Sequence, residues 1–187
     1  MNHSQSDLAS LIKAADDIAA DAKATFGPLS PAQLNWKPSA DRWSVGQCFD
    51  HLQTSNEGYF PIIDDVLGGK KQTFWERMPF LPGLSARMLL KFLDPASTRK
   101  VKAPARFEPT QSDVSDSIID EFVTHQAKLI DKMRSTEQLL IDKIVITSPV
   151  SGAITYSLLN AYRIIIVHEL RHFQQAKRVT EEPAFPH

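Results

Sequence analysis

The sequence predicts an all-α protein, a four-helix bundle in which residues 1–187 form a single domain. Three observations support this fold. Four long stretches carry apolar residues at helical spacing, no two neighbouring stretches alternate convincingly as paired strands, and one long irregular connection, residues 68–111, separates the second helix from the third. The chain has 187 residues, 42% of them hydrophobic and 23% charged, which suffices for one domain with a real core.

The first helix is expected over residues 6–25, because apolar side chains recur there at helical spacing until Gly27 and Pro28 end the pattern. Residues 27–43 contain three prolines and are expected to form a loop. Trp36 and Trp43 bracket this loop, and we expect them to pack over one end of the bundle, because exposed aromatic rings are costly.

The second helix is expected to begin at Ser44 and to continue to Leu67. Ser44 and Gln47 have the spacing of a capping box, in which the serine side chain accepts from the backbone three residues on and the glutamine reaches back. Pro61 lies inside this run and should kink or interrupt it, because proline lacks the backbone N–H that a helix interior uses.

The second half of the chain predicts two more long helices. One is expected from Asp113 to about Arg134 with Ser112 as its N-cap, and the last from Thr155 to Arg178. Between them, the apolar run from residue 139 to residue 146 could end as extended chain. Within the long connection, residues 84–93 could form a short helix.

Composition and charge argue against several classes of protein. The formal net charge is −1, which gives no indication of nucleic-acid binding. No apolar run approaches the roughly 18 residues of a membrane span, and the N-terminus lacks the pattern of a secretory signal. Cys48 is the only cysteine, which excludes an intrachain disulfide and fits a reducing compartment. We therefore expect a cytoplasmic protein that binds neither nucleic acid nor membrane.

The five residues His168-Glu169-Leu170-Arg171-His172 carry the clearest chemical signal. Residues four apart lie on the same face of a helix, so His168 and His172 can present two imidazoles to one metal ion, the spacing of the H-E-x-x-H zinc motif. A zinc protease is one interpretation, with Glu169 as general base, but only fifteen residues follow His172 and no sheet is predicted to align a peptide substrate. A chance pair of histidines is the plain alternative.

Three stretches stand out, Asn35-Trp36-Lys37-Pro38, the run W-S-V-G-Q-C-F-D-H-L over residues 43–52, and residues 168–172 followed by Gln174-Gln175. They resemble motifs of the DinB-like superfamily, and the resemblance runs over essentially the whole chain. The resemblance implies a four-helix bundle with a three-histidine site for a divalent metal, one ligand from helix two and two from the last helix. Carried over by motif position, the ligands are His51, His168 and His172. Family members are often dimers, so the resemblance also implies a possible homodimer.

The resemblance also implies a reaction class. The family includes enzymes that transfer a low-molecular-weight thiol and proteins described as metal-dependent hydrolases, so we expect a metal-dependent enzyme acting on a small molecule. Zinc or nickel suits imidazole ligands, and a low-molecular-weight thiol is a candidate cofactor. A non-catalytic, stress-related or binding bundle with a structural or vestigial metal is the alternative.

Residues 68–111 carry nine basic and three acidic side chains, a local charge of +6. The segment could act as a lid in which Lys100, Lys102 or Arg106 steers an anionic reactant, or it could be a solvated connection. Its apolar residues, with Trp75, Phe80 and Leu81 among them, make docking to a partner or membrane conceivable, although prolines break the pattern.

Other polar residues near the motifs are weaker candidates. His125 and Glu169 are candidate acid–base groups. A core or surface histidine is the simpler interpretation of His125, and a solvated or inter-helix salt-bridge role is the alternative for Glu169. Asp50 and Glu169 are also candidate partners for the second nitrogen of a ligand, although each lies next to a ligand and points about 100° away from it. Cys48 lies one turn from His51 and could face the metal, but a buried, inert thiol is the simpler interpretation. Tyr162 and Ser55 could reach the pocket, and Arg163 and Arg171 most simply lie on the outer face of the last helix.

Overall fold

The computed structural model of the chain describes residues 3–77, 81–93, 107–109 and 113–186. Within this part the chain is mostly helical and carries one small sheet. The elements follow one another as α1 (His3–Phe26), α2 (Pro31–Asn35), α3 (Val45–Glu57), α4 (Phe60–Leu67), the 3-10 turn η1 (Trp75–Arg77), α5 (Leu81–Phe92), α6 (Ile118–Ser135), β1 (Val145–Thr147), β2 (Thr155–Ser157) and α7 (Leu158–Thr180).

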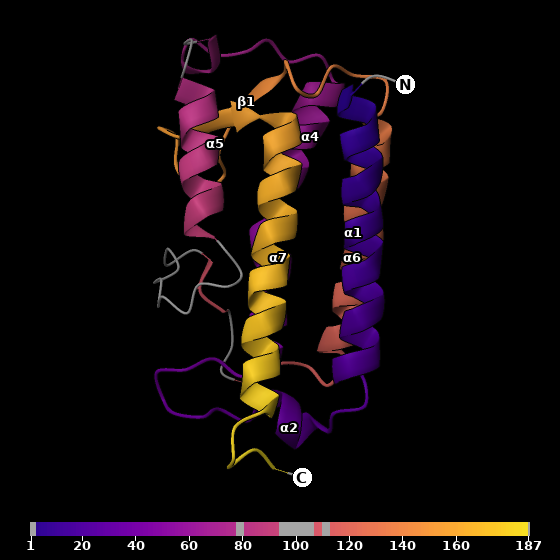
Figure 1. The fold of residues 1–187 in the computed structure, drawn as a ribbon, viewed down its shortest axis with the longest axis vertical. Helices are drawn as coiled ribbons and strands as arrows, with labels where there is room; N and C mark the ends of the chain where they lie inside the picture. Colours follow the sequence, from indigo (N-terminus) through magenta and orange to yellow (C-terminus); the bar gives the residue numbers. More distant parts are fainter. Residues whose placement is uncertain (1–2, 78–80, 94–106, 110–112, 187) are drawn as a thin grey trace.

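Four of the helices pack against one another in a ring. Helix α1 contacts α6 and α7, and α3 contacts the same two helices from the other side. Figure 1 shows α1, α6 and α7 running along the long axis of the molecule, with the two chain ends at opposite ends of it. Buried apolar side chains fill the space between these helices, among them Phe26, Phe49, Phe122, Leu129 and Tyr162. No helix in the described part of the chain combines the length and the apolar character needed to cross a membrane.

The second helix confirms both its predicted start and its predicted interruption. Ser44 caps α3, accepting from the backbone of Gln47, whose side chain reaches back to the backbone of Ser44. The helix ends at Glu57, and α4 begins at Phe60 with Pro61 in its first turn, where the missing N–H of proline costs nothing. The predicted run of residues 44–67 is therefore two helices joined at Gly58 and Tyr59.

The loop predicted over residues 27–43 contains one short helix that the sequence analysis missed. Ser30 and Gln33 form a second capping box at the start of α2, and Pro31 occupies its first turn. Three prolines predict a loop here, but a proline at the first helical position is already in the backbone conformation a helix needs. Trp36 packs edge-on against Phe185, with ring centroids 5.6 Å apart, at the end of the molecule where the chain terminates.

The third long helix begins later than predicted, at Ile118 instead of Asp113. The reason is a clamp on the preceding residues, because Asn35 accepts from the backbone N–H of Val114 at 2.7 Å and donates to its carbonyl at 3.2 Å. These two bonds hold Val114 outside the helix. The predicted N-cap, Ser112, lies outside the described residues.

A two-stranded antiparallel sheet corrects the expectation that the chain forms no strand pair. Residues Val145–Thr147 pair with Thr155–Ser157, with Ile146 opposite Tyr156. The extended end predicted for the run 139–146 is thus confirmed, while α7 begins at Leu158, three residues later than predicted, with Ser157 as its cap. Three-residue strands are too short for alternation to be visible in the sequence.

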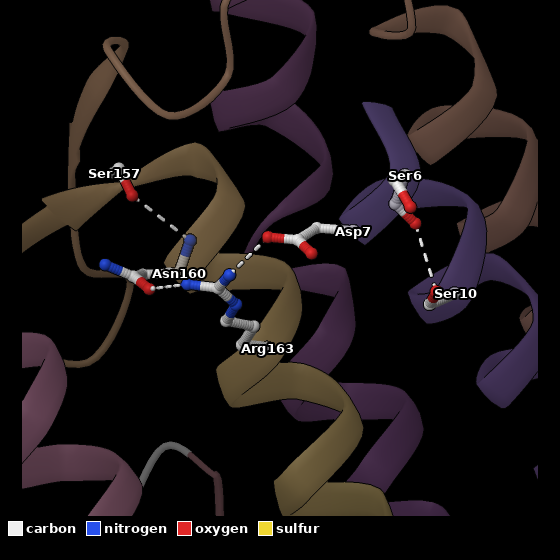
Figure 2. A network of polar contacts seen from close by, with 6 residues as sticks. All are labelled: Ser6, Asp7, Ser10, Ser157, Asn160 and Arg163. Carbon is white, nitrogen blue, oxygen red and sulfur yellow. Dashed lines mark hydrogen bonds and ion pairs between the residues drawn. The ribbon is translucent and has the colours of Figure 1, made fainter. Parts of the chain in front are cut away.

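The start of α7 is tied to α1 by the polar contacts in Figure 2. Arg163 donates to Asp7 at 2.7 Å and to Asn160 at 3.0 Å, and the N–H of Asn160 donates to Ser157 at 3.2 Å. Arg171 is buried, which corrects the prediction that it lies on the outer face of the last helix, whereas Arg163 is only half-buried.

The connection between α4 and α6 contains more structure than expected. Helix α5 begins three residues earlier than predicted and packs on β2 and α7. Its outer side exposes three apolar side chains, Leu84, Met88 and Phe92. Lys100, Lys102, Arg106 and Phe80 lie outside the described residues, as do the side chains of Trp75 and Leu81, so the predicted steering role of this segment stays a prediction.

Candidate metal centre

Three histidines from two helices meet between α3 and α7. Helix α3 carries His51, and α7 carries His168 and His172 one turn apart on the same face. One ring nitrogen from each lies within 4.8 Å of the other two. The Nε2 atoms of His51 and His168 are 3.1 Å apart. The structure therefore brings together the three residues that the family resemblance selected.

The surroundings keep these imidazoles neutral. His51 and His172 are buried, and His168 is half-buried. Burial is the main cause of the low pKa of all three rings, and it lowers that of His168 to about 3, with smaller contributions from His51 and from the charge of Arg171. A neutral imidazole offers a lone pair, which is the form that binds a metal ion.

The donor set fits a divalent metal. His51 donates from Nδ1 to the carbonyl oxygen of Phe107 at 2.5 Å, which leaves Nε2 without a proton on the side facing His168. Two nitrogens that bind one tetrahedral zinc ion at 2.0–2.1 Å lie about 3.3 Å apart, close to the separation found here. Nδ1 of His172 is buried with no hydrogen-bond partner among the described residues, and Gln175 acts only weakly, raising the pKa of the ring.

Trp43 covers one side of the cluster. Its ring stacks on His172, with centroids 5.6 Å apart and planes inclined by 23°, and lies 4.8 Å from the ring of His51. Trp43 was predicted only to pack over one end of the bundle. The available signal was the W-S-x-G motif of residues 43–46, because the run over residues 43–52 begins with this motif and includes His51.

The side chain of Glu169 lies in the space between α3, α6 and α7. Its side chain is fully buried, and its two oxygens accept from Asn56 of α3 at 2.7 Å and from Gln126 of α6 at 2.9 Å. Burial raises its pKa to about 7, and the two hydrogen bonds act against that rise. The solvated or salt-bridged carboxylate expected at this position is instead bonded to two amides.

The weaker candidates lie elsewhere. His125 is buried and stacks on Phe60, with centroids 5.1 Å apart, and is not among the three grouped histidines. Cys48 is fully buried, and burial raises the pKa of its thiol to about 12. Tyr162 bonds through its hydroxyl to Thr136 at 3.1 Å, and Ser55 is half-buried.

The group that orients His51 was not predicted from the sequence. Asp50 and Glu169 were the candidate side chains, whereas the acceptor is the main-chain carbonyl of Phe107, 56 residues away in the chain. Every residue carries such a carbonyl, so no residue type marks this position.

A separate cavity of about 480 Å³ lies between the end of α4, the following residues and β1. Its polar lining includes Asp65, Lys71 and Glu76, and none of the three clustered histidines borders it. Glu76 accepts from Thr147 at 2.8 Å and from the backbone of Thr73 at 2.7 Å, so this lining is internally bonded.

Comparison with known proteins supports the assignment made from the motifs. Residues 14–176 match the family model of the DinB superfamily. A search of curated proteins and a search of solved structures found no match. The family match covers most of the chain and includes all three clustered histidines. The chain therefore belongs to the DinB superfamily.

Proposed function

We propose that this protein binds one divalent metal ion through His51, His168 and His172 and is a metal-dependent enzyme acting on a small molecule, by thiol transfer or hydrolysis. The four mutually packed helices would then be the four-helix bundle of the family. The single observation that carries the proposal is the meeting of three neutral ring nitrogens within 4.8 Å, contributed by two helices. Zinc and nickel are the metals that suit such ligands best.

Each residue of the site has a defined part in this proposal. A divalent metal held by three imidazoles would supply Lewis-acid chemistry, which acidifies water or a thiol. His51 is held in its binding tautomer by the Phe107 carbonyl, and Trp43 shields the side formed by His51 and His172. His168 is the most exposed of the three, so we place the approach of the reactant on its side.

The reactant is proposed to be a low-molecular-weight thiol with an electrophile, or a hydrolysable small molecule. No carboxylate belongs to the described group of ligands, so a bound dication would keep its full charge and would favour an anionic reactant. Arg87 and Lys91 on α5 are exposed and add positive charge to the connection between α4 and α6.

Metal binding is tested by measuring zinc and nickel affinity of the metal-free protein by calorimetry, with elemental analysis of the protein as purified. We expect one ion per chain, with His51→Ala and His168→Ala each losing binding. His125→Ala is the matched control, because it removes another buried histidine outside the cluster. Metal uptake that is unchanged in His51→Ala would rule out the three-histidine site.

Catalysis is tested separately with the metal-loaded protein. A screen of thiol transfer to electrophiles and of ester hydrolysis should find activity in the wild-type protein that is lost in His168→Ala. A protein that binds metal but has no activity in either screen would favour the alternative, a non-catalytic bundle with a structural metal. The burial of His51 and His172 under Trp43 is the observation on the side of that alternative.

A further inference from the structure

Glu169 follows a ligand in the chain, and its contacts differ from those of a general base. A general base needs a free oxygen within hydrogen-bond reach of the proton it removes. Here Oε1 accepts from Asn56 and Oε2 accepts from Gln126, inside a fully buried environment. Both oxygens are occupied by buried amides, one from α3 and one from α6.

We infer that Glu169 is a positioning residue, which fixes the rotation of α7 relative to α3 and α6 so that His168 and His172 face His51. This inference rests on the proposed metal site. Asn56 lies on the same helix as His51, so α3 and α7 are joined twice, at His51 to His168 and at Asn56 to Glu169. Gln126 adds a bond to the third helix.

The hydrogen bond between Asn56 and Glu169 affects the contact between His51 and His168 for a geometric reason. Successive residues on a helix point about 100° apart, so a carboxylate fixed toward α3 and α6 sets the direction in which the preceding histidine points. Apolar packing alone tolerates small rotations of a helix, because it has no directional preference. Two hydrogen bonds from different helices are directional and remove that freedom.

Two substitutions of Glu169 are expected to differ in their effect on zinc affinity. Glu169→Ala removes both acceptors, so Asn56 loses this bond and Gln126 keeps only its long bond to the Ala15 carbonyl at 3.5 Å. Zinc affinity should therefore fall by about ten- to a hundredfold, as when partners of metal ligands are removed. Glu169→Gln should keep the wild-type affinity. Its oxygen can accept from Asn56, and its amide can donate to Oε1 of Gln126 once the terminal amide of Gln126 turns over, because Nε2 faces residue 169 in the wild-type protein and Oε1 has no partner among the described residues. If Glu169 were instead a general base, both variants would lose that base.

The experiment measures zinc affinity by competition with a chromophoric chelator, together with the thermal midpoint of the metal-free protein. Thr136→Val is the matched control, since it also breaks a buried hydrogen bond to α7, at Tyr162, but outside the cluster. We expect Thr136→Val to lower the midpoint without changing the affinity. If Glu169→Ala does not fold, Asn56→Ala removes only the α3 bond and is expected to weaken zinc binding in the same direction.

A reciprocal exchange gives a second test. Asn56→Asp alone sets two carboxyl groups against each other and should weaken zinc binding, while Asn56→Asp with Glu169→Gln restores a donor facing an acceptor and should recover it. The inference is overturned if Glu169→Ala binds zinc like the wild-type protein, if Glu169→Gln is as weak as Glu169→Ala, or if the exchange recovers nothing. If the wild-type protein itself binds no zinc or nickel, the proposed function falls and this inference falls with it.

Discussion

The ring of Trp43 lies nearly parallel to the ring of His172, with their centroids 5.6 Å apart. This contact places an indole directly against a candidate metal ligand, and the same indole lies 4.8 Å from His51. Trp43 should therefore respond to whatever binds the three histidines. It also limits the directions from which a reactant can approach the site.

Tryptophan fluorescence should report metal binding through this contact. Titration of the metal-free protein with Ni²⁺ is expected to quench the emission, because a paramagnetic ion deactivates an excited indole at short range. Trp43→Phe should lose most of the quenching while it still binds the metal. Trp36→Phe is the matched control, since Trp36 packs on Phe185 and should leave the quenching intact. Equal quenching in both variants would place the metal elsewhere.

The glycine of the W-S-x-G motif should be required for packing. A Cβ atom added at Gly46 would lie 2.1 Å from Cγ2 of Val114 and 3.2 Å from the carbonyl oxygen of Leu34. Gly46→Ala is therefore expected to destabilise the protein by roughly 1–3 kcal/mol, the usual range for overpacking. Gly83→Ala is the control, because it meets open space in a helix and should be neutral or stabilising by at most about 1 kcal/mol. Urea unfolding measures both, and equal effects would contradict the close approach.

His125 should make stability depend on pH in the acidic range. Burial lowers its pKa to about 4, whereas the unfolded chain takes up the proton near 6.5. Below pH 6.5 the unfolded state binds more protons, so this stability is fully present above 6.5 and is lost as the pH falls toward 4. The loss is on the order of 3 kcal/mol at most, at 1.36 kcal/mol for each unit of pKa.

His125→Phe tests this dependence, because it keeps an aromatic ring against Phe60 and removes the titrating group. We expect the unfolding free energy of the variant to fall less than that of the wild-type protein between pH 6.5 and pH 4. Chemical denaturation of the metal-free proteins at several pH values gives the comparison. Parallel curves for the two proteins would show that His125 does not titrate differently on folding.

Cys48 should be unreactive in the folded protein. Its side chain is fully buried, and a pKa of about 12 leaves almost no thiolate at neutral pH. A disulfide reagent such as Ellman's is expected to react only after the protein unfolds, with a rate that follows the unfolding reaction. Rapid modification of the native protein would mean that the thiol is accessible and would reopen a role for it in thiol chemistry.

Structural features that depend on one short stretch of the chain could be predicted from the sequence. The capping box at Ser44, the break near Pro61 and the periodicity of α7 depend on residues within a turn or two of one another, and all were predicted correctly. The three histidines needed more, because the spacing of His168 and His172 left the third ligand open. The resemblance of two motifs supplied His51, and the structure brings that residue to the other two.

The rest was decided by contacts between distant parts of the chain. The late start of α6 depends on Asn35 holding Val114, and the tautomer of His51 depends on the carbonyl of Phe107. The sequence places Glu169 about 100° from His168 on the helix, but only the packing of α3 and α6 around α7 makes that direction a buried site with two amides instead of a solvated surface. Backbone groups carry no residue-specific signal, and a helical pattern does not say which neighbour covers each face, so tertiary packing alone determined these features.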